Sequence, residues 1–411
     1  MDGYFATESH DRIRNEVRAF AETEVRPRVP DMEADRGVAH ELSRLIARQG
    51  WIGAAIDPDH GGMGAGHVAK TIIIEELSRV SGAMGAMAQA SQLGVAKIIH
   101  FGTPAQKKRW LPAVAAGDCL PTIAVTETTS GSHVLGMSTT ARRDGDSYVL
   151  NGRKAFVGNS HVGDLHGVVA RTGERGGRSL SAFLVEADRP GFSLAPHRPA
   201  VGLPGFSFGE LIFDDCRVPV ENLLGVEGDG LDVAYSSSIL VGRPNLTAVS
   251  LGIHEALVAE TVRFAQWQHR YGKPVAELPT VRDQIGRMQS QLMTARLVAY
   301  HAAHLLDAGV ACDAELQNAK LINAEYALDS ARLAVEIHGA HGLFPEDSPI
   351  ARYQRDAFHI LPPAGTSAVQ RLRLAEYALG TVKGTPWSTR FTTPEPAEVV
   401  PLHVEPLIEA V

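Results

Sequence analysis

Apolar residues recur at helical spacing over most of this chain, with one interruption near its middle. From residue 9 to about 117 they return every three or four positions, which predicts helices joined by glycine-rich turns. Between residues 120 and about 224 the runs shorten to strand-like segments such as 181–185, and turns such as Asn151-Gly152 separate them. Helical periodicity then resumes and predicts four long helices, at residues 246–268, 281–308, 313–338 and 368–382.

This order of segments predicts a mainly helical α+β protein. We expect an N-terminal helical domain at 1–119, a small β-barrel or sandwich at 120–225 and a four-helix bundle at 226–384. Residues 385–411 are rich in proline and glutamate and lack periodicity, so they are expected to form a tail or an arm over a neighbouring surface.

Composition narrows the class of partner. The 411 residues carry a formal net charge of −8 without a cluster of basic residues, which argues against nucleic acid and anionic lipid as partners. Apolar runs are too short for a membrane span and the first residues are polar, so we expect a cytoplasmic protein. Three widely separated cysteines argue against a disulfide framework or a zinc site, and we expect no metal.

Three motifs carry a resemblance to a known family. Residues 355–371 read RDAFHILPPAGTSAVQR, residues 101–112 read FGTPAQKKRWLP and residues 217–225 read RVPVENLLG. Each resembles a motif of the acyl-CoA dehydrogenases, and they lie in the same order over residues 9 to 384. The resemblance implies FAD, an acyl thioester substrate on coenzyme A or a carrier protein, and a homodimer or homotetramer.

The resemblance also assigns residues to the flavin site. In the segment from Ala124 to Ser132, small and hydroxyl side chains suit contacts of backbone N–H groups with the flavin ring and the diphosphate. Phe156 would be the aromatic wall against the flavin, and Gly158 replaces a threonine that commonly donates to it. The expected cofactor-binding residues are Val125, Thr126, Gly131, Ser132, Phe156, Gly158, Arg270, Gly339, Gly365 and Thr366.

Other flavin contacts depart from the family pattern. Gln268 replaces an arginine that reaches the diphosphate, often across a subunit boundary, and Arg270 would supply the lost charge. Glu336 replaces a glutamine, and a carboxylate near a diphosphate is unfavourable unless it points away. Ala368 replaces a polar residue.

The catalytic base of the family is missing. Ala364 stands where the resemblance places a glutamate that removes the α-proton of the thioester. A second family position for that glutamate, just before Arg243, holds Gly242, and an extra residue between Gly230 and Arg243 brings no acid into register. His359, five residues before Ala364, is our first candidate for a substitute base, and the other candidates are His133, His338, His341 and Glu127.

Three functions therefore remain open at this point. The leading one is an FAD-dependent oxidoreductase, of the EC 1.3 type, that acts on an acyl thioester with a displaced base or with a substrate acidic enough to need none. A flavin monooxygenase on the same fold needs no α-proton abstraction and is the alternative. A flavin-free acyl-binding protein or non-redox lyase is the third.

Overall fold

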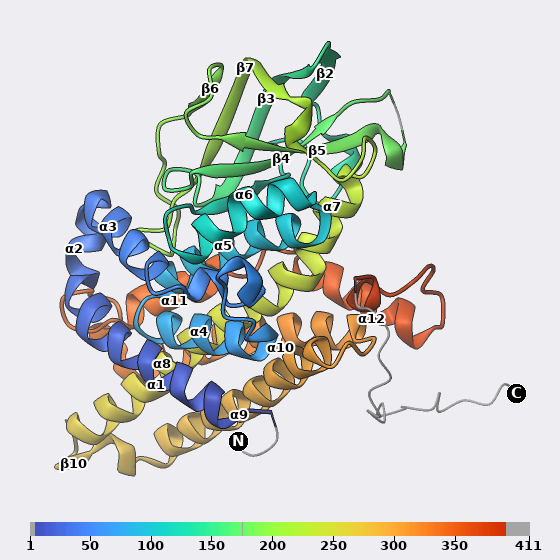
Figure 1. The fold of residues 1–411 in the computed structure, drawn as a ribbon. Helices are drawn as coiled ribbons and strands as arrows, with labels where there is room; N and C mark the ends of the chain where they lie inside the picture. Colours follow the sequence, from blue (N-terminus) through green and yellow to red (C-terminus); the bar gives the residue numbers. More distant parts are fainter. Residues whose placement is uncertain (1–4, 175, 392–411) are drawn as a thin grey trace, which may run out of the picture.

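The computed structural model describes residues 5–174 and 176–391, so most of the predicted tail lies outside the described residues (Figure 1). Its mainly helical α+β architecture confirms the expected fold class (Figure 1). The N-terminal part is helical, with helices α1 (Glu8–Phe20), α2 (Val29–Ala34), α3 (Arg36–Ala47), α4 (Gly66–Val80), α5 (Gly82–Phe101) and α6 (Pro104–Ala115).

Local sequence explains where these helices begin. The Thr103 hydroxyl accepts from the Gln106 backbone N–H, and the Gln106 side chain accepts from the Thr103 N–H, which forms a capping box at the start of α6. Ser81 caps α5 in a similar way, because its hydroxyl accepts from the Met84 N–H.

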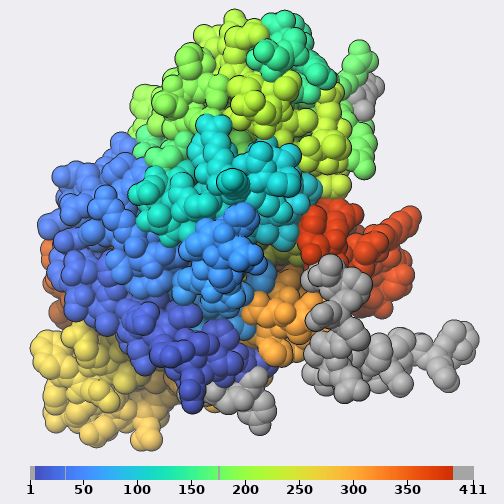
Figure 2. All heavy atoms as spheres, viewed as in Figure 1, coloured from blue at the N-terminus to red at the C-terminus, as the bar shows by residue number. Residues whose placement is uncertain are grey.

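The middle of the chain forms a twisted sheet, which lies above the N-terminal helices in the view of Figure 2. Its strands are β1 (Pro121–Ala124), β2 (Thr140–Asp144), β3 (Ser147–Gly158), β4 (Leu165–Arg171), β5 (Leu180–Glu186), β6 (Phe192–Leu194), β7 (Phe208–Pro219) and β8 (Leu223–Leu224). They follow the order β6-β7-β3-β2-β4-β5-β8, and β1 pairs in parallel with β4. The turn predicted at Asn151-Gly152 is wrong, because both residues lie within β3, where the pairing with β7 shifts its register. The ring centroids of Tyr148 on β3 and Phe183 on β5 are 4.8 Å apart, although β2 and β4 lie between these strands. The sheet therefore curls around a core of its own.

A helical bundle follows the sheet. It contains α7 (Gly230–Ser236), a π-helical turn (Ser237–Gly242), α8 (Arg243–Trp267), α9 (Pro279–Asp307), α10 (Asp313–His338), α11 (Ile350–His359) and α12 (Ser367–Ala378). A short hairpin of β9 (His269–Arg270) and β10 (Lys273–Pro274) joins α8 to α9. The last helix ends at Ala378, earlier than the predicted limit at 382, because the backbone turns left-handed at Gly380.

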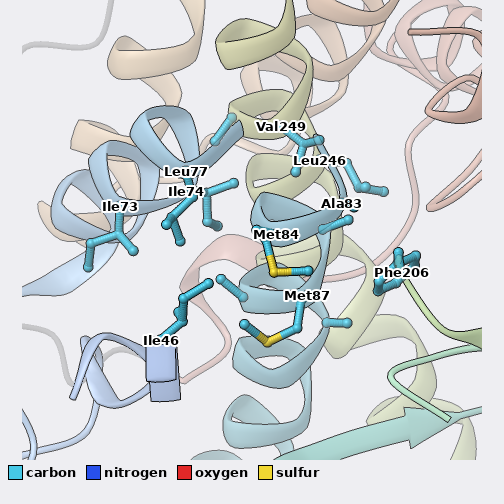
Figure 3. Packing of buried hydrophobic residues seen from close by; sticks show 14 of the residues in the cluster. Ile46, Ile73, Ile74, Leu77, Ala83, Met84, Met87, Phe206, Leu246 and Val249 are labelled. Atoms are coloured by element: carbon cyan, nitrogen blue, oxygen red, sulfur yellow. The ribbon is translucent and has the colours of Figure 1, made fainter. Parts of the chain in front are cut away.

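The main hydrophobic core joins the N-terminal helices to the bundle. Figure 3 shows Ile73, Ile74 and Leu77 of α4 close to Met84 and Met87 of α5. The side chains of Leu246 and Val249 approach the same cluster from α8 (Figure 3). Helix α5 packs between α4 and α8 and also contacts β1, β3, β4 and β8, so the sheet is held against this core through α5.

Close packing of α5 against β1 fixes the position of this strand. A Cβ on Gly94 of α5 would lie 2.3 Å from the Pro121 carbonyl carbon of β1, so only glycine allows this approach. The segment that follows β1 is the one for which flavin contacts were predicted. Its position is therefore set by a helix–strand contact.

The side chains of Cys119, Cys216 and Cys312 are buried free thiols. Among the helices that the structure describes, none combines the length and apolar character needed to cross a bilayer.

Candidate functional site

A large cavity lies where the sheet meets the helices. Its volume is about 1680 Å³, and its walls come from the segment after β1, from β3, from the turn before α8, and from α10 and α12. Pockets for single small molecules usually measure about 300–1,000 Å³. This cavity can therefore accommodate a dinucleotide cofactor and a substrate together.

Most of the predicted site residues line this cavity. The structure brings together Val125, Thr126, Gly131, Ser132, Phe156, Gly158, His359, Ala364, Gly365 and Thr366. Arg270 and Gly339 are not among the lining residues. Arg270 lies on the β9–β10 hairpin, at the end of the bundle away from the sheet, and Gly339 ends α10 (Figure 1).

The predicted flavin segment is held by a buried ion pair. The Lys154 Nζ lies 2.9 Å from Glu127 Oε1 and donates to the Val125 carbonyl at 3.0 Å. Glu127 also accepts from the backbone N–H groups of Ser138 and Thr139, at 2.6 and 2.9 Å. Burial alone would raise the pKa of Glu127, but the Lys154 charge and these hydrogen bonds outweigh it and lower the pKa to about 2. Glu127 lines the cavity, but its carboxylate is bound by Lys154 and two backbone N–H groups, which favours a structural role over our suggestion that it acts as a base.

Phe156 and Gly158 of β3 form another part of the cavity wall. Phe156 has a left-handed backbone, with φ of 55°, and its side chain remains 48% exposed although the residue lies within a strand. A Cβ on Gly158 would lie 2.9 Å from Phe206 Cζ and 3.1 Å from Ala90 Cβ. The Phe206 ring therefore occupies the space that a threonine at 158 would need.

Ala364 lies in a constrained loop between α11 and α12. Its φ is 53°, a left-handed conformation that costs an alanine more than a glycine. The Lys320 Nζ donates to the Leu361 carbonyl at 2.6 Å, and the Gln370 amide donates to the Ala364 carbonyl at 3.0 Å. Sequence reasoning did not identify Lys320 or Gln370 as positioning residues, because each acts on a backbone carbonyl.

The π-helical turn brings the second vacant base position to the same place. Gly242 is its last residue, and a Cβ added there would lie 3.3 Å from Ala364 Cβ. A π-helix holds more residues per turn than an α-helix, so this turn has room for the extra residue that the family resemblance implies before Arg243.

The candidate histidines are separated by the structure. His359 lines the cavity, and its ring centroid is 5.3 Å from that of Phe208. Burial lowers the pKa of His359, and a hydrogen bond with the Gly202 backbone opposes this effect. His338 instead stacks on Phe264 at 4.0 Å, and His341 pairs with Asp347.

The remaining predicted positions lie outside the cavity lining. His133 is exposed, and its backbone carbonyl accepts from the Ser130 hydroxyl at 2.6 Å. Glu336 points to Arg332 and Gln284, at 2.6 and 3.0 Å, so its carboxylate is turned away from the cavity.

The comparisons with known proteins agree with this architecture. Models of the acyl-CoA dehydrogenase N-terminal, middle and C-terminal domains match residues 7–118, 122–216 and 228–379. An acyl-CoA dehydrogenase of Bacillus subtilis is 35% identical over 376 residues, which cover 91% of this chain and 99% of that protein.

Solved structures give the same result. A glutaryl-coenzyme A dehydrogenase in complex with glutaryl-CoA superposes with a TM-score of 0.89 at 28% identity, and the match covers 95% of this chain and 98% of the other. The prolyl acyl carrier protein oxidase AnaB superposes with a TM-score of 0.82 at 26% identity, over 90% and 99% of the two chains. The chain therefore belongs to the acyl-CoA dehydrogenase family and is an FAD-dependent flavoprotein oxidoreductase.

Proposed function

We propose that this protein oxidises an acyl thioester, carried on coenzyme A or on an acyl carrier protein, at a site that lacks the carboxylate base at both family positions. The observation that carries the proposal is the shared cavity. It joins the flavin segment around Val125 to the loop at Ala364 and to Gly242, so a cofactor and a thioester would meet inside it.

The residues present fit FAD. A Cβ on Gly131 would meet no atom within 4 Å, so the backbone there is open to a close ligand. Thr366 is the N-cap residue of α12, where free backbone N–H groups suit a phosphate, and the half-exposed Phe156 ring offers a flat apolar wall. When bound, FAD supplies the acceptor for the hydride that leaves the β-carbon of the acyl group.

Carboxylates around the cavity are engaged by other groups. Glu127 pairs with Lys154, Asp232 with Arg390, and Glu210 with Arg198. Asp313 and Glu376 are also held by partners. This leaves His359 as our candidate base, because its lowered pKa keeps the imidazole neutral and able to accept a proton at neutral pH.

The same vacancy at Ala364 and Gly242 favours a second candidate, a flavin monooxygenase, since oxygen transfer needs no abstraction of an α-proton. The flavin-free alternative is disfavoured by the family's cofactor. The two flavin functions differ in what reduces the cofactor, and this difference can be measured directly.

The test is an anaerobic titration of the purified protein. We expect a flavin absorbance spectrum, and we expect its bleaching when an acyl-CoA is added without oxygen. A protein that takes up no FAD on reconstitution would contradict the proposal. If thioesters leave the flavin oxidised, but the externally reduced flavoprotein consumes oxygen with an amine or aromatic substrate, the monooxygenase function replaces it.

A second copy of the chain completes the cofactor site in this proposal. Arg270 and Gly339 lie away from the cavity of their own chain, whereas the family resemblance assigns both to the cofactor. Trp267 and Tyr271 flank Arg270 and are 72% and 92% exposed, which suits a surface covered in an oligomer. We therefore propose a homodimer or homotetramer in which the hairpin of one subunit reaches the cofactor of another.

A further inference from the structure

The described part of the chain continues past the last matched domain and returns to the cavity. The C-terminal domain of the family matches residues 228–379, whereas the structure describes the chain up to residue 391. We call residues 381–391 the strap. Residues 381–387 all line the cavity, and residues 381–385 are also exposed. The strap therefore forms part of the mouth of the cavity, although it lies outside the part of the chain that the family match covers.

Asp313, at the start of α10, holds the strap by its backbone. Its Oδ1 accepts from the Ser388 N–H and its Oδ2 from the Trp387 N–H, each at 2.8 Å. The Cys312 N–H in turn donates to the Ser388 hydroxyl at 2.9 Å. These bonds fix the backbone of Trp387 beside α10.

Two further contacts hold the end of the strap. The Arg390 guanidinium pairs with Asp232 of α7 at 3.1 Å, and Phe391 stacks on His100 of α5 with ring centroids 4.4 Å apart. The Arg390 guanidinium also lies 3.8 Å from the centre of the Trp387 ring and covers one of its faces. Because the strap is held by α5, α7 and α10, the Trp387 ring has a fixed place in the cavity wall.

The strap faces the helical segment that leads to the vacant base positions. The ring centroids of Trp387 and Tyr235 are 6.0 Å apart. Tyr235, Ser238 and Gly242 line the cavity along one helical segment. Tyr235 precedes Gly242 by seven residues, which is roughly 10 Å along a helix axis. A group that lies beside Trp387 is thus well separated from the reacting carbons, which the family resemblance places at Gly242 and Ala364.

The cofactor is expected elsewhere in the cavity. Its diphosphate is expected at Gly131, Ser132 and Thr366, and α12, which is about 18 Å long, separates Thr366 from the start of the strap. Another exposed part of the lining, at Phe156 and Arg198, lies on the side of the sheet, where Phe156 suits the flavin ring. The mouth at the strap is therefore left for the substrate.

The substrate would pass this mouth with the arm that joins its thioester to its carrier. The carrier, a charged nucleotide or a folded protein, stays in solvent, whereas an acyl group can lie inside the cavity. In coenzyme A and in acyl carrier proteins this arm is phosphopantetheine, which contains amides, a branched apolar carbon and a phosphate.

The strap offers a partner for each part of such an arm. Trp387 offers an apolar ring, and Thr381 and Thr385 offer hydroxyl groups for the amides. Lys383 is exposed and lines the cavity, and within the described ranges no carboxylate pairs with its ammonium group. We propose that the strap binds the phosphopantetheine arm of the substrate, with Trp387 against its apolar part and Lys383 at its phosphate. This inference rests on the proposed thioester function.

The test uses thioesters of one acyl group that differ only in the arm. An N-acetylcysteamine thioester carries the thioester end of the arm, a pantetheine thioester carries the whole arm without its phosphate, and a 4′-phosphopantetheine thioester adds the phosphate. The series is made with a butyryl and with an octanoyl group. Dissociation constants would be measured on the FAD-loaded protein by anaerobic calorimetry. We expect each addition to the arm to tighten binding about 2- to 10-fold, from an aromatic contact and from an exposed ion pair.

Two larger ligands distinguish the sources of the arm. The same acyl group is presented on coenzyme A and on an acyl carrier protein. The one that binds at least as tightly as the phosphopantetheine thioester identifies the carrier. Weaker binding of both would show that the strap does not admit an arm with its carrier attached, and would overturn the inference.

Variants locate the effect on the strap. Trp387→Ala should remove the gain between N-acetylcysteamine and pantetheine, and Lys383→Gln should remove the gain from the phosphate, while neither weakens FAD. Trp110→Ala and Lys108→Gln are the matched controls, because both residues lie outside the cavity lining. Trp110 also packs under an arginine, since the Arg109 guanidinium lies 4.3 Å from the centre of its ring.

Each result has a distinct meaning. Equal binding of the three thioesters by the native protein overturns this inference and leaves the thioester function intact, even where a variant does not fold. The inference also fails if Trp387→Ala weakens the N-acetylcysteamine thioester as much as the others, because the ring would then meet the acyl group. A loss of FAD affinity in folded Trp387→Ala would assign the strap to the cofactor instead. If none of the thioesters binds, the proposed function fails and this inference fails with it.

Discussion

The Cβ of Ala364 lies 3.3 Å from the point where a Cβ on Gly242 would stand, so the two vacant positions of the catalytic base are in contact on the cavity wall. They come from different elements, the α11–α12 loop and the π-helical turn before α8. A carboxylate placed on either element would therefore enter the same volume.

This relationship predicts that Ala364→Glu creates a base. The added carboxylate has room because Gly242 carries no side chain, and general-base catalysis contributes about 10²–10⁴-fold to a rate. We expect faster flavin bleaching by acyl-CoA under anaerobic conditions than in the native protein. Ala364→Gln has the same shape without the basic group, and an equal gain in that variant would contradict the prediction.

The Lys154–Glu127 pair predicts a strong effect on stability. Glu127→Gln leaves Lys154 buried without its counter-charge, and breaking a buried pair in this way costs about 3–5 kcal/mol of unfolding free energy. Urea unfolding measures this cost, and the exposed Glu16→Gln serves as the control. If Glu127→Gln lost no more than about 1 kcal/mol of unfolding free energy beyond the loss in Glu16→Gln, the pair would not be stabilising.

The same pair predicts how the free energy of unfolding changes at acidic pH. The pKa of Glu127 is lowered from its usual 4.5 to about 2 in the folded chain. Its contribution to the free energy of unfolding is therefore complete above about pH 5 and is lost as the pH falls toward 2. We expect the difference in stability between the native protein and Glu127→Gln to shrink over this range, as measured by urea unfolding at successive pH values. A constant difference would exclude this ionisation as its source.

Gly158→Thr should be destabilising although threonine is the family residue at this position. The new Cβ would lie 2.9 Å from Phe206 Cζ, and overpacking of this kind costs about 1–3 kcal/mol. Phe206→Leu removes the obstructing atom, so the double variant should lose less stability than the sum of the two single variants. Gly286→Thr is the control, because a Cβ there meets nothing within 4 Å. Additive losses in thermal unfolding would show that the two residues do not compete for space.

Arg270→Ala should weaken FAD binding through the neighbouring subunit. Loss of a charge-assisted hydrogen bond should reduce the free energy of FAD binding by about 1.5–3 kcal/mol, which is measured through the FAD dissociation constant. Arg263→Ala provides a control, since Arg263 is 74% exposed and pairs with Glu260 on its own helix. Sedimentation should show a dimer or tetramer, and a monomer with undiminished FAD affinity would contradict the shared site.

The sequence predicted the helix–sheet–helix order because periodicity is a local property of the chain. Helix α5 was the least visible element, since most of its residues are buried all around and its small residues show no polar face. The sequence left open whether the residues from 385 onward form a tail or an arm over a neighbouring surface. Trp387 and Phe391 are held by Asp313 and His100, which lie far away in the sequence, so these contacts could not be predicted.

The candidate site was predicted where motifs are continuous and missed where contacts are tertiary. The flavin segment and Ala364 could be located from motifs. The structural role of Glu127 could not be predicted, because its ion pair with Lys154 depends on the pairing of distant segments. The lack of a carboxylate partner for Arg243 among the described residues likewise becomes visible only in the structure, where Asp313 accepts from the Trp387 and Ser388 N–H groups.

Because of the π-helical turn, deletion of one residue would change which side chains line the cavity. Removing one residue from Ser237–Gly242 would restore ordinary helical winding and rotate α7 by about 100° about the helix axis. Leu231 and Tyr235, which now line the cavity, would turn away from it, while Arg243 and the bundle behind it would keep their positions. A single lost codon would thus exchange the residues that meet an incoming substrate, and related chains with and without the extra residue should differ first in what they admit.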